Sequence, residues 1–252
     1  MSLNILTKNR EGLSALSNLL IYMRISANII STAPRLGFVP VEVFGIIRRM
    51  KRVYVDGQNF LYKAAEVLIE HGKISSKDEL TKIDIRLLVE NIVGVGVEIM
   101  FYGARVQVRR DLDDSILEKT TRFSDVARRL RNTLKNQNIT FNEVGKLKVR
   151  DSDVCHNCQH RDLRMQEKGV DVGIAVDIVI DSLNGLVDEV VLVSSDTDLL
   201  PAIRVAKARG IKVTYIGFSD KMTRAIIARA DASEVIRNQE IIDAFDIYNN
   251  TQ

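Results

Sequence analysis

Short runs rich in β-branched and aromatic residues alternate with stretches of helical spacing along most of the chain. Strands are expected over residues 53–55, 98–102, 139–142, 190–194 and 212–216. Helices are expected over residues 60–70, 83–92, 124–135, 167–182, 199–208 and 221–229. Strands that alternate with helices form parallel sheets covered on both faces. The pattern therefore predicts an α/β fold with three layers, α/β/α, around a central, mainly parallel sheet.

Length and composition favour one domain. The chain has 252 residues, of which 46% are hydrophobic and 27% charged, so a sizeable core forms and wholesale disorder is excluded. Residues 50–240 are expected to form the domain, because Met50, Lys51 and Arg52 lead directly into the first strand. Residues 1–49 are expected to be an N-terminal extension outside it, helical or disordered, and residues 241–252 a C-terminal tail. Our hypothesis is that the native start is Met50.

The N-terminal extension contains an apolar stretch over residues 13–30, but Asn18, Arg24 and Asn28 interrupt it. Such a stretch is too broken to span a bilayer, so no membrane partner is expected. Its apolar residues recur at helical spacing, which leaves an amphipathic targeting helix and a dispensable extension both open. The two cysteines give no secreted disulfide framework, which favours the cytoplasm.

The charge is modest and unevenly spread. The formal net charge is +3; residues 1–49 contain six Lys/Arg and two Asp/Glu, a net of +4, which leaves 3 − 4 = −1 for the rest. A globally basic nucleic-acid surface is therefore excluded. Binding of a nucleic acid would depend on local basic stretches, and these also suit plain solvated faces. The stretches are Arg128, Arg129, Arg131 and Lys135, and Lys146, Lys148 and Arg150.

Acidic residues follow two of the expected strands. Asp56 ends the first strand before Gly57, and Asp196 and Asp198 follow the strand that ends at Ser194. The carboxyl ends of parallel strands meet at one edge of a sheet, where ligands bind near the reversal of strand order. Taken alone, Asp56 also suits a turn with Gly57, and Asp196 a helix cap.

A third acid lies on the expected helix 167–182, whose apolar residues cover most of its circumference and predict a largely buried helix. Asp171, Asp177 and Asp181 are then costly unless they are solvated, paired or bound to a cation. Lys168 and Asp171 would share a helix face, so Asp171 also suits a cap or a pair with Lys168. A hard divalent cation, Mg²⁺ or Mn²⁺, would relieve the repulsion among acids at one sheet edge.

Three blocks in order, VDGQNF (55–60), KGVDVGIAVD (168–177) and VSSDTDLLPAIRVAKARGIKVTYIGF (193–218), resemble the NYN domain family of PIN-like nucleases. The similarity covers residues 51–236 and includes Ala230 and Asp231. It implies a PIN-like sheet and a metal-dependent ribonuclease that hydrolyses RNA phosphodiester bonds at carboxylate-bound Mg²⁺ or Mn²⁺. The resemblance assigns metal binding to Asp56, Asp171 and Asp196. It adds, as further catalytic residues, Asn59, Lys168, Ser194 and Asp198. Two residues depart from the family pattern, and neither departure removes a carboxylate. They are Ser195, where glycine is common, and Gln58.

Two other functions stay open. A non-cleaving RNA-binding or protein-interaction module on the same fold is expected to lose at least one of Asp56, Asp171 and Asp196, and all are present. Hydrolysis of small phosphorylated molecules uses the same kind of site. RNA is the expected partner, and a homodimer is a further possibility.

The sequence CHNCQH gathers Cys155, Cys158 and His160 in one loop. A C-x-x-C pair is a common way to present thiolates to structural Zn²⁺, but a closed site needs four ligands. His156, His71, a carboxylate or another subunit would have to supply the fourth. Structural zinc and unligated thiols both remain open.

Overall fold

The computed structural model describes residues 50–110, 114–151 and 163–251. The extension 1–49 and the loop that contains Cys155, Cys158 and His160 lie outside these residues. The strands are β1 (Lys51–Asp56), β2 (Glu98–Arg105), β3 (Thr140–Asp151), β4 (Leu163–Lys168), β5 (Glu189–Val193), β6 (Lys212–Phe218) and β7 (Ala232–Ile236). The helices are α2 (Gly57–Glu70), α3 (Ile85–Val93), α4 (Asp114–Asn136), α5 (Val170–Leu183), α6 (Leu200–Ala208), α7 (Arg224–Ile227) and α8 (Asn238–Asn250), with 3-10 helices η1 (Lys77–Thr81) and η2 (Thr197–Leu199).

The seven strands form one sheet in the order β4-β3-β2-β1-β5-β6-β7. All neighbouring pairs are parallel except β3 and β4, which are antiparallel. The chain builds the sheet outward from β1 on one side and then returns to build the other side from β5. The reversal therefore lies between β1, which ends at Asp56, and β5, which ends one residue before Ser194.

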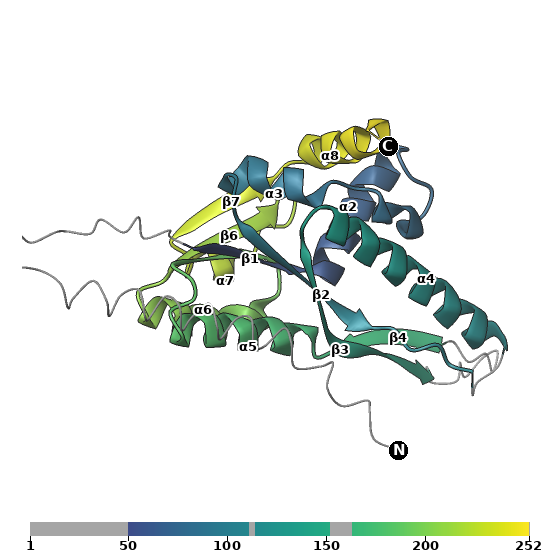
Figure 1. Cartoon of the computed structure of the whole chain (residues 1–252), viewed down its shortest axis with the longest axis horizontal. Coiled ribbons are helices and arrows are strands. Elements are labelled where there is room, and N and C mark those ends of the chain that lie inside the picture. Colours follow the sequence, from purple (N-terminus) through teal and green to yellow (C-terminus); the bar gives the residue numbers. More distant parts are fainter. Residues whose placement is uncertain (1–49, 111–113, 152–162, 252) are drawn as a thin grey trace, which may run out of the picture. The chain divides into compact units, whose positions relative to one another are not determined.

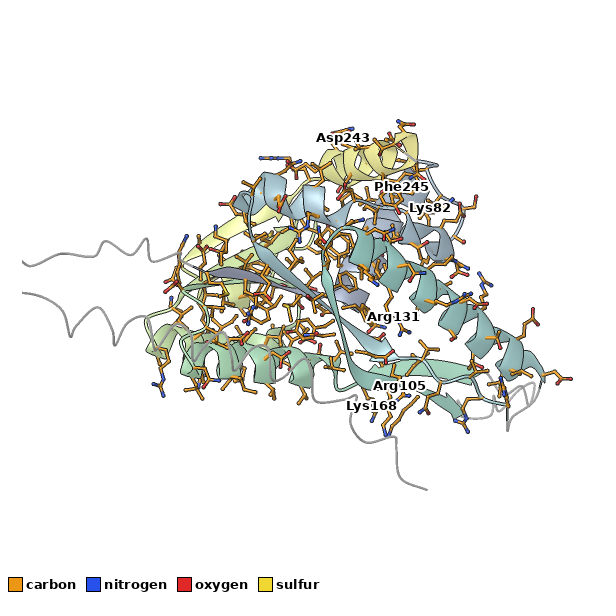
Figure 2. All side chains as sticks on the ribbon, in the orientation of Figure 1. Lys82, Arg105, Arg131, Lys168, Asp243 and Phe245 are labelled. Carbon is orange, nitrogen blue, oxygen red and sulfur yellow. The ribbon has the colours of Figure 1, made fainter. Side chains whose placement is uncertain are left out.

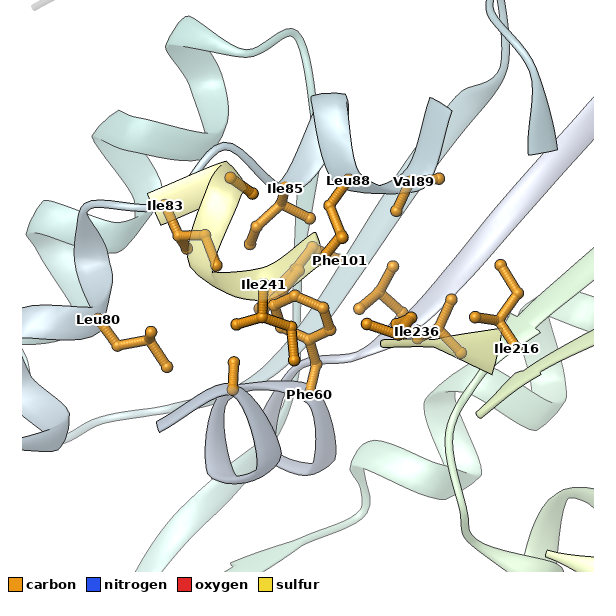
Figure 3. Close-up of a cluster of buried hydrophobic side chains, with 14 of the residues drawn as sticks. Phe60, Leu80, Ile83, Ile85, Leu88, Val89, Phe101, Ile216, Ile236 and Ile241 are labelled. Carbon is orange, nitrogen blue, oxygen red and sulfur yellow. The ribbon is translucent and has the colours of Figure 1, made fainter. Parts of the chain in front are cut away.

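Helices cover both faces of this sheet (Figure 1). Val53 and Val55 of β1 point into a core with α2, α3, α4 and α8. Tyr54 points into a second core with α5 and α6. Figure 3 shows the first core, where Phe60 and Phe101 lie among aliphatic side chains. The three-layer α/β/α fold with a mainly parallel sheet is thereby confirmed.

The sequence predicted that acids on α5 would need to be solvated, paired or bound to a cation. Two of them are paired with polar groups beneath this helix. Asp181 is buried and accepts hydrogen bonds from the guanidinium of Arg52 and, at 2.5 Å, from the hydroxyl of Tyr54. Tyr102 donates to Asp177 at 2.8 Å. Both acids are therefore paired within the fold, and neither is free for a ligand.

The predicted helix 167–182 was wrong at its start. Residues Leu163–Lys168 form β4, which pairs with β3, and α5 begins only at Val170. Gly169 separates the two elements with a φ of 87°, a left-handed conformation that favours glycine. Lys168 and Asp171 therefore share no helix face, because Lys168 ends a strand.

The expectation that this helix would be largely buried was also wrong on one side of the helix. Val172 is 66% exposed, and Val176 and Ile180 are exposed as well, so one apolar stripe of α5 faces away from the sheet. Among residues 50–110, 114–151 and 163–251, the structure contains no helix long and apolar enough to cross a membrane.

The expected C-terminal tail is instead part of the folded structure. Most of residues 241–252 belong to α8, and Ile241 and Ile242 are buried in the first core. The boundary at residue 240 is therefore corrected to include α8.

Candidate functional site

Asp56 lies at the carboxyl end of β1, where the chain turns into α2. It is 5% exposed, and both of its oxygens are engaged: Oδ1 accepts from the backbone N–H of Asn59 at 3.1 Å and Oδ2 from the hydroxyl of Ser194 at 2.9 Å. Asp56 thus caps α2, a role that the sequence had suggested for Asp196 and not for Asp56. The hydroxyl of Ser194 reaches it from the neighbouring β5 and holds its carboxylate in one orientation.

Gly57 permits this turn to lie close to β2. A Cβ atom at Gly57 would lie 2.3 Å from the carbonyl oxygen of Tyr102 and 2.4 Å from the ring of Phe101. Real contacts are never that short, so any side chain would push α2 away from the sheet. The position of Asp56 therefore depends on glycine at the next residue.

The loop after β5 carries the second acid. Asp196 caps η2 by accepting from the backbone N–H of Asp198 at 2.8 Å, while its own N–H donates to Ser194 Oγ at 3.1 Å. The side-chain amide of Asn59 donates to Ser195 Oγ at 2.6 Å. These hydrogen bonds join the turns after β1 and β5 into one structure.

Two further acids complete the site from the other side. Glu167 is the penultimate residue of β4, and Asp171 lies in the first turn of α5. Together with Asp56 and Asp196, they line a cavity of about 280 Å³, called here the acidic cavity. Its remaining lining residues are Gln58, Asn59, Tyr62, Lys63, Gly169 and Val170.

Burial and nearby negative charge make Asp56, Glu167 and Asp171 hard to ionise. Burial raises the pKa of Asp56, and the charge of Asp196 adds to the shift. Burial also raises the pKa of Asp171, with further contributions from Asp196 and Asp56. The pKa of Glu167 rises to about 7, first because of burial and then because of the charge of Asp56. Groups with like charge gathered in one cavity raise each other's pKa in this way, and functional sites often show such shifts.

The structure separates the expected site residues into two groups. Asp56, Asn59, Asp171 and Asp196 line the acidic cavity, and Ser194 lies buried behind Asp56. Asp198 is exposed and lines a different cavity, between α5 and α6. Lys168 is exposed at the end of β4 and is not among the residues that line the acidic cavity. The side chains of Asp198 and Lys168 are thus beside the site and not in it.

Sequence reasoning missed Glu167 and Lys63. Glu167 was assigned to a helix, and only the pairing of β4 with β3 turns its side chain toward the acidic cavity. Lys63 is 8% exposed and forms an ion pair with Glu66 at 2.9 Å. A lysine three residues from a glutamate on a helix is typical of a surface pair. No signal in the sequence marked either residue.

The chemistry of the cavity fits a hard divalent cation. Its donors are carboxylate and amide oxygens, which Mg²⁺ and Mn²⁺ prefer. Asn59 Oδ1 and Glu167 Oε2 are buried without a hydrogen-bond partner, so each has an oxygen available for an ion. Within the described residues, no three Asp, Glu, His or Cys side chains lie close enough together to hold an ion jointly. Binding therefore requires these side chains to draw together.

Comparison with known proteins now decides the family. The NYN domain family matches residues 52–237. The chain belongs to the NYN domain family. Among solved structures, the chain is similar to a crystal structure of a protein of unknown function, VPA0982 from Vibrio parahaemolyticus RIMD 2210633. The two share 19% sequence identity with a TM-score of 0.46, over 75% of this chain and 93% of the other. No curated protein matches the chain.

Proposed function

We propose that this NYN domain is a metal-dependent ribonuclease that hydrolyses RNA phosphodiester bonds. One observation carries the proposal: the four carboxylates of Asp56, Glu167, Asp171 and Asp196 gather at a single cavity at the carboxyl edge of the sheet, beside the reversal between β1 and β5. Four carboxylates at one cavity repel one another, and a bound cation would relieve that repulsion. NYN domains are nuclease-like as a family, which agrees with this chemistry.

The proposed ligands of Mg²⁺ or Mn²⁺ are Asp56, Asp171 and Asp196. When bound, such an ion supplies positive charge that stabilises a phosphate's transition state and lowers the pKa of bound water. Ser194 and the backbone N–H of Asn59 orient Asp56 before any ligand arrives, because each already holds one of its oxygens. This preorganisation lowers the cost of bringing the carboxylates together.

Exposed cations beside the acidic cavity are proposed to bind the RNA backbone. Lys146 and Lys168 are register partners on β3 and β4, and both are exposed, as is Lys148. Figure 2 shows Lys168 and Arg105 in the same region of the view. These cationic side chains would bind the phosphates of RNA whatever its base sequence.

A cleavage assay on unstructured single-stranded RNA tests the proposal. Purified full-length chain should cut it with Mg²⁺ or Mn²⁺ and stop when EDTA removes the ion. Asp56→Asn, Asp171→Asn and Asp196→Asn should each lose at least about a hundredfold in rate, because an amide supplies no negative charge to an ion. Asp198→Asn should lose much less, since Asp198 lies outside the acidic cavity.

Asp243→Asn is the matched control, because Asp243 is exposed on α8, does not line the acidic cavity and lies far from Lys168 in Figure 2. It should cut RNA at the wild-type rate. Asn variants of the acidic cavity that cut as fast as wild type would refute the assignment of the site. Wild-type protein that binds RNA but never cuts it, with either ion, would establish the binding-module alternative.

We propose the cytoplasm as the compartment, since both cysteines would stay reduced there.

A further inference from the structure

We propose that an apolar cleft beside the acidic cavity receives one unpaired base of the RNA, next to the bond that is cut. The inference rests on the proposed ribonuclease function and adds to it a subsite for a nucleobase. The cleft has a volume of about 370 Å³, within the range of about 300–1,000 Å³ that is usual for small-ligand sites. It lies between α2, α4 and the strands β2 and β3.

The cleft adjoins the acidic cavity. Gln58, Tyr62 and Glu167 line both cavities, so one wall separates them. A nucleotide whose phosphate lies among the carboxylates therefore has its base, or that of its neighbour, at the mouth of the cleft. Neither the cavity between α5 and α6 nor the one lined by Lys51 and Gly210 contains any of these three residues.

The walls of the cleft contain several aromatic side chains. Aromatic rings line the cleft, among them Phe123 of α4, which is 38% exposed, and Tyr62 of α2, which is 48% exposed. Phe101 and Phe141 lie on the adjacent strands and stack with a centroid distance of 6.2 Å. Exposed aromatic rings beside a backbone-binding site are the usual platforms on which single-stranded bases stack. Aliphatic walls alone would suit a lipid or a peptide better.

Charged side chains lie beside the aromatic rings of the cleft. Lys77 Nζ lies 3.7 Å from the centroid of the Tyr62 ring, and the guanidinium of Arg131 lies 5.6 Å from that of Phe141. These two cations lie against aromatic rings of the cleft, and Asp78, which also lines it, is paired with Arg122. A flat apolar wall with cations beside it matches a nucleotide, whose base is flat and whose phosphate is negative.

The test uses full-length protein and a set of single-stranded RNA oligomers in which one nucleotide, at a different position in each, lacks its base. At one position beside the cut, loss of the base should lower kcat/KM about tenfold, in line with the ~1–3 kcal/mol measured for one stacked base. Phe123→Ala should lose a similar factor on intact RNA and nothing further on that base-free oligomer. Phe123→Tyr retains a ring and should behave as wild type.

Ile247→Ala is the control, because Ile247 is a similarly exposed apolar residue on α8 that does not line the cleft. Tyr62→Ala is a second variant in case Phe123→Ala fails to fold. If wild type cuts every base-free oligomer as it cuts intact RNA, the base subsite is refuted and the ribonuclease stands. If wild type binds RNA without cutting, the same coupling measured in the binding constant decides the subsite alone. Protein that neither cuts nor binds RNA refutes both.

Discussion

Replacing Glu167 by Gln should stabilise the ion-free protein at neutral and alkaline pH. The folded structure raises the pKa of this carboxyl from 4.5 to about 7, through burial and through the charge of Asp56. The unfolded chain ionises near pH 4.5 and the folded one only near pH 7, so between these values the folded state binds more protons. Stability therefore falls as pH rises through this window, and the whole loss is present above pH 7.

The magnitude follows from the shift. A difference of 7 − 4.5 = 2.5 pKa units, at ~1.36 kcal/mol each, gives about 3 kcal/mol as an upper bound. Water at the mouth of the cavity screens the charge, and about 1–2 kcal/mol is the expected gain. For a domain of this size it corresponds to a rise of about 3–6 °C in melting temperature.

Thermal unfolding in EDTA, followed by circular dichroism between pH 4 and pH 8, measures this gain. Glu167→Gln should melt above wild type at pH 8 and together with it at pH 4. Glu234→Gln, at an exposed position of β7, is the control and should track wild type throughout. The reasoning fails if Glu167→Gln melts with wild type at pH 8, or if its gain is the same at pH 4.

Three further predictions concern stability and can be checked by the same melting assay. Arg52→Met should cost about 3–5 kcal/mol, because it leaves the buried carboxylate of Asp181 without its cation; a loss below ~1 kcal/mol would show that the pair is dispensable. Gly57→Ala should cost about 1–3 kcal/mol, since its Cβ would collide with the Tyr102 carbonyl; an unchanged melting temperature would mean that the turn adapts freely. A chain that begins at Met50 should melt as the full chain does, because every strand of the sheet lies within residues 51–236; a lower melting temperature would contradict that.

The parts of the fold that the sequence predicted best are those with long apolar runs. The central strands β1 and β5 are buried on both faces, so their apolar runs and the acids that follow them could be read directly. The mainly parallel sheet then followed from the alternation of strands with helices. Asp56 and Asp196 were therefore found without a structure.

The parts that were missed depend on long-range pairing. β4 has the sequence LRMQEK, whose apolar–polar alternation covers only its first four residues, and it becomes a strand because β3 supplies a partner. The position of Glu167 follows from that pairing. The exposed stripe on α5 was missed for another reason: an all-round apolar pattern does not tell which side lacks a cover.

The hydrogen bond between Ser194 and Asp56 joins residues 138 positions apart. At ~5–20 residues per second, a ribosome makes the intervening chain in roughly ten seconds. Throughout that time the edge of β1 that later receives β5 lacks its partner. If the domain cuts RNA, a nascent chain still held near its own message has Asp56 but not yet Asp196. If that proposal holds, the acidic cavity is incomplete until Asp196 has been made and β5 has paired with β1.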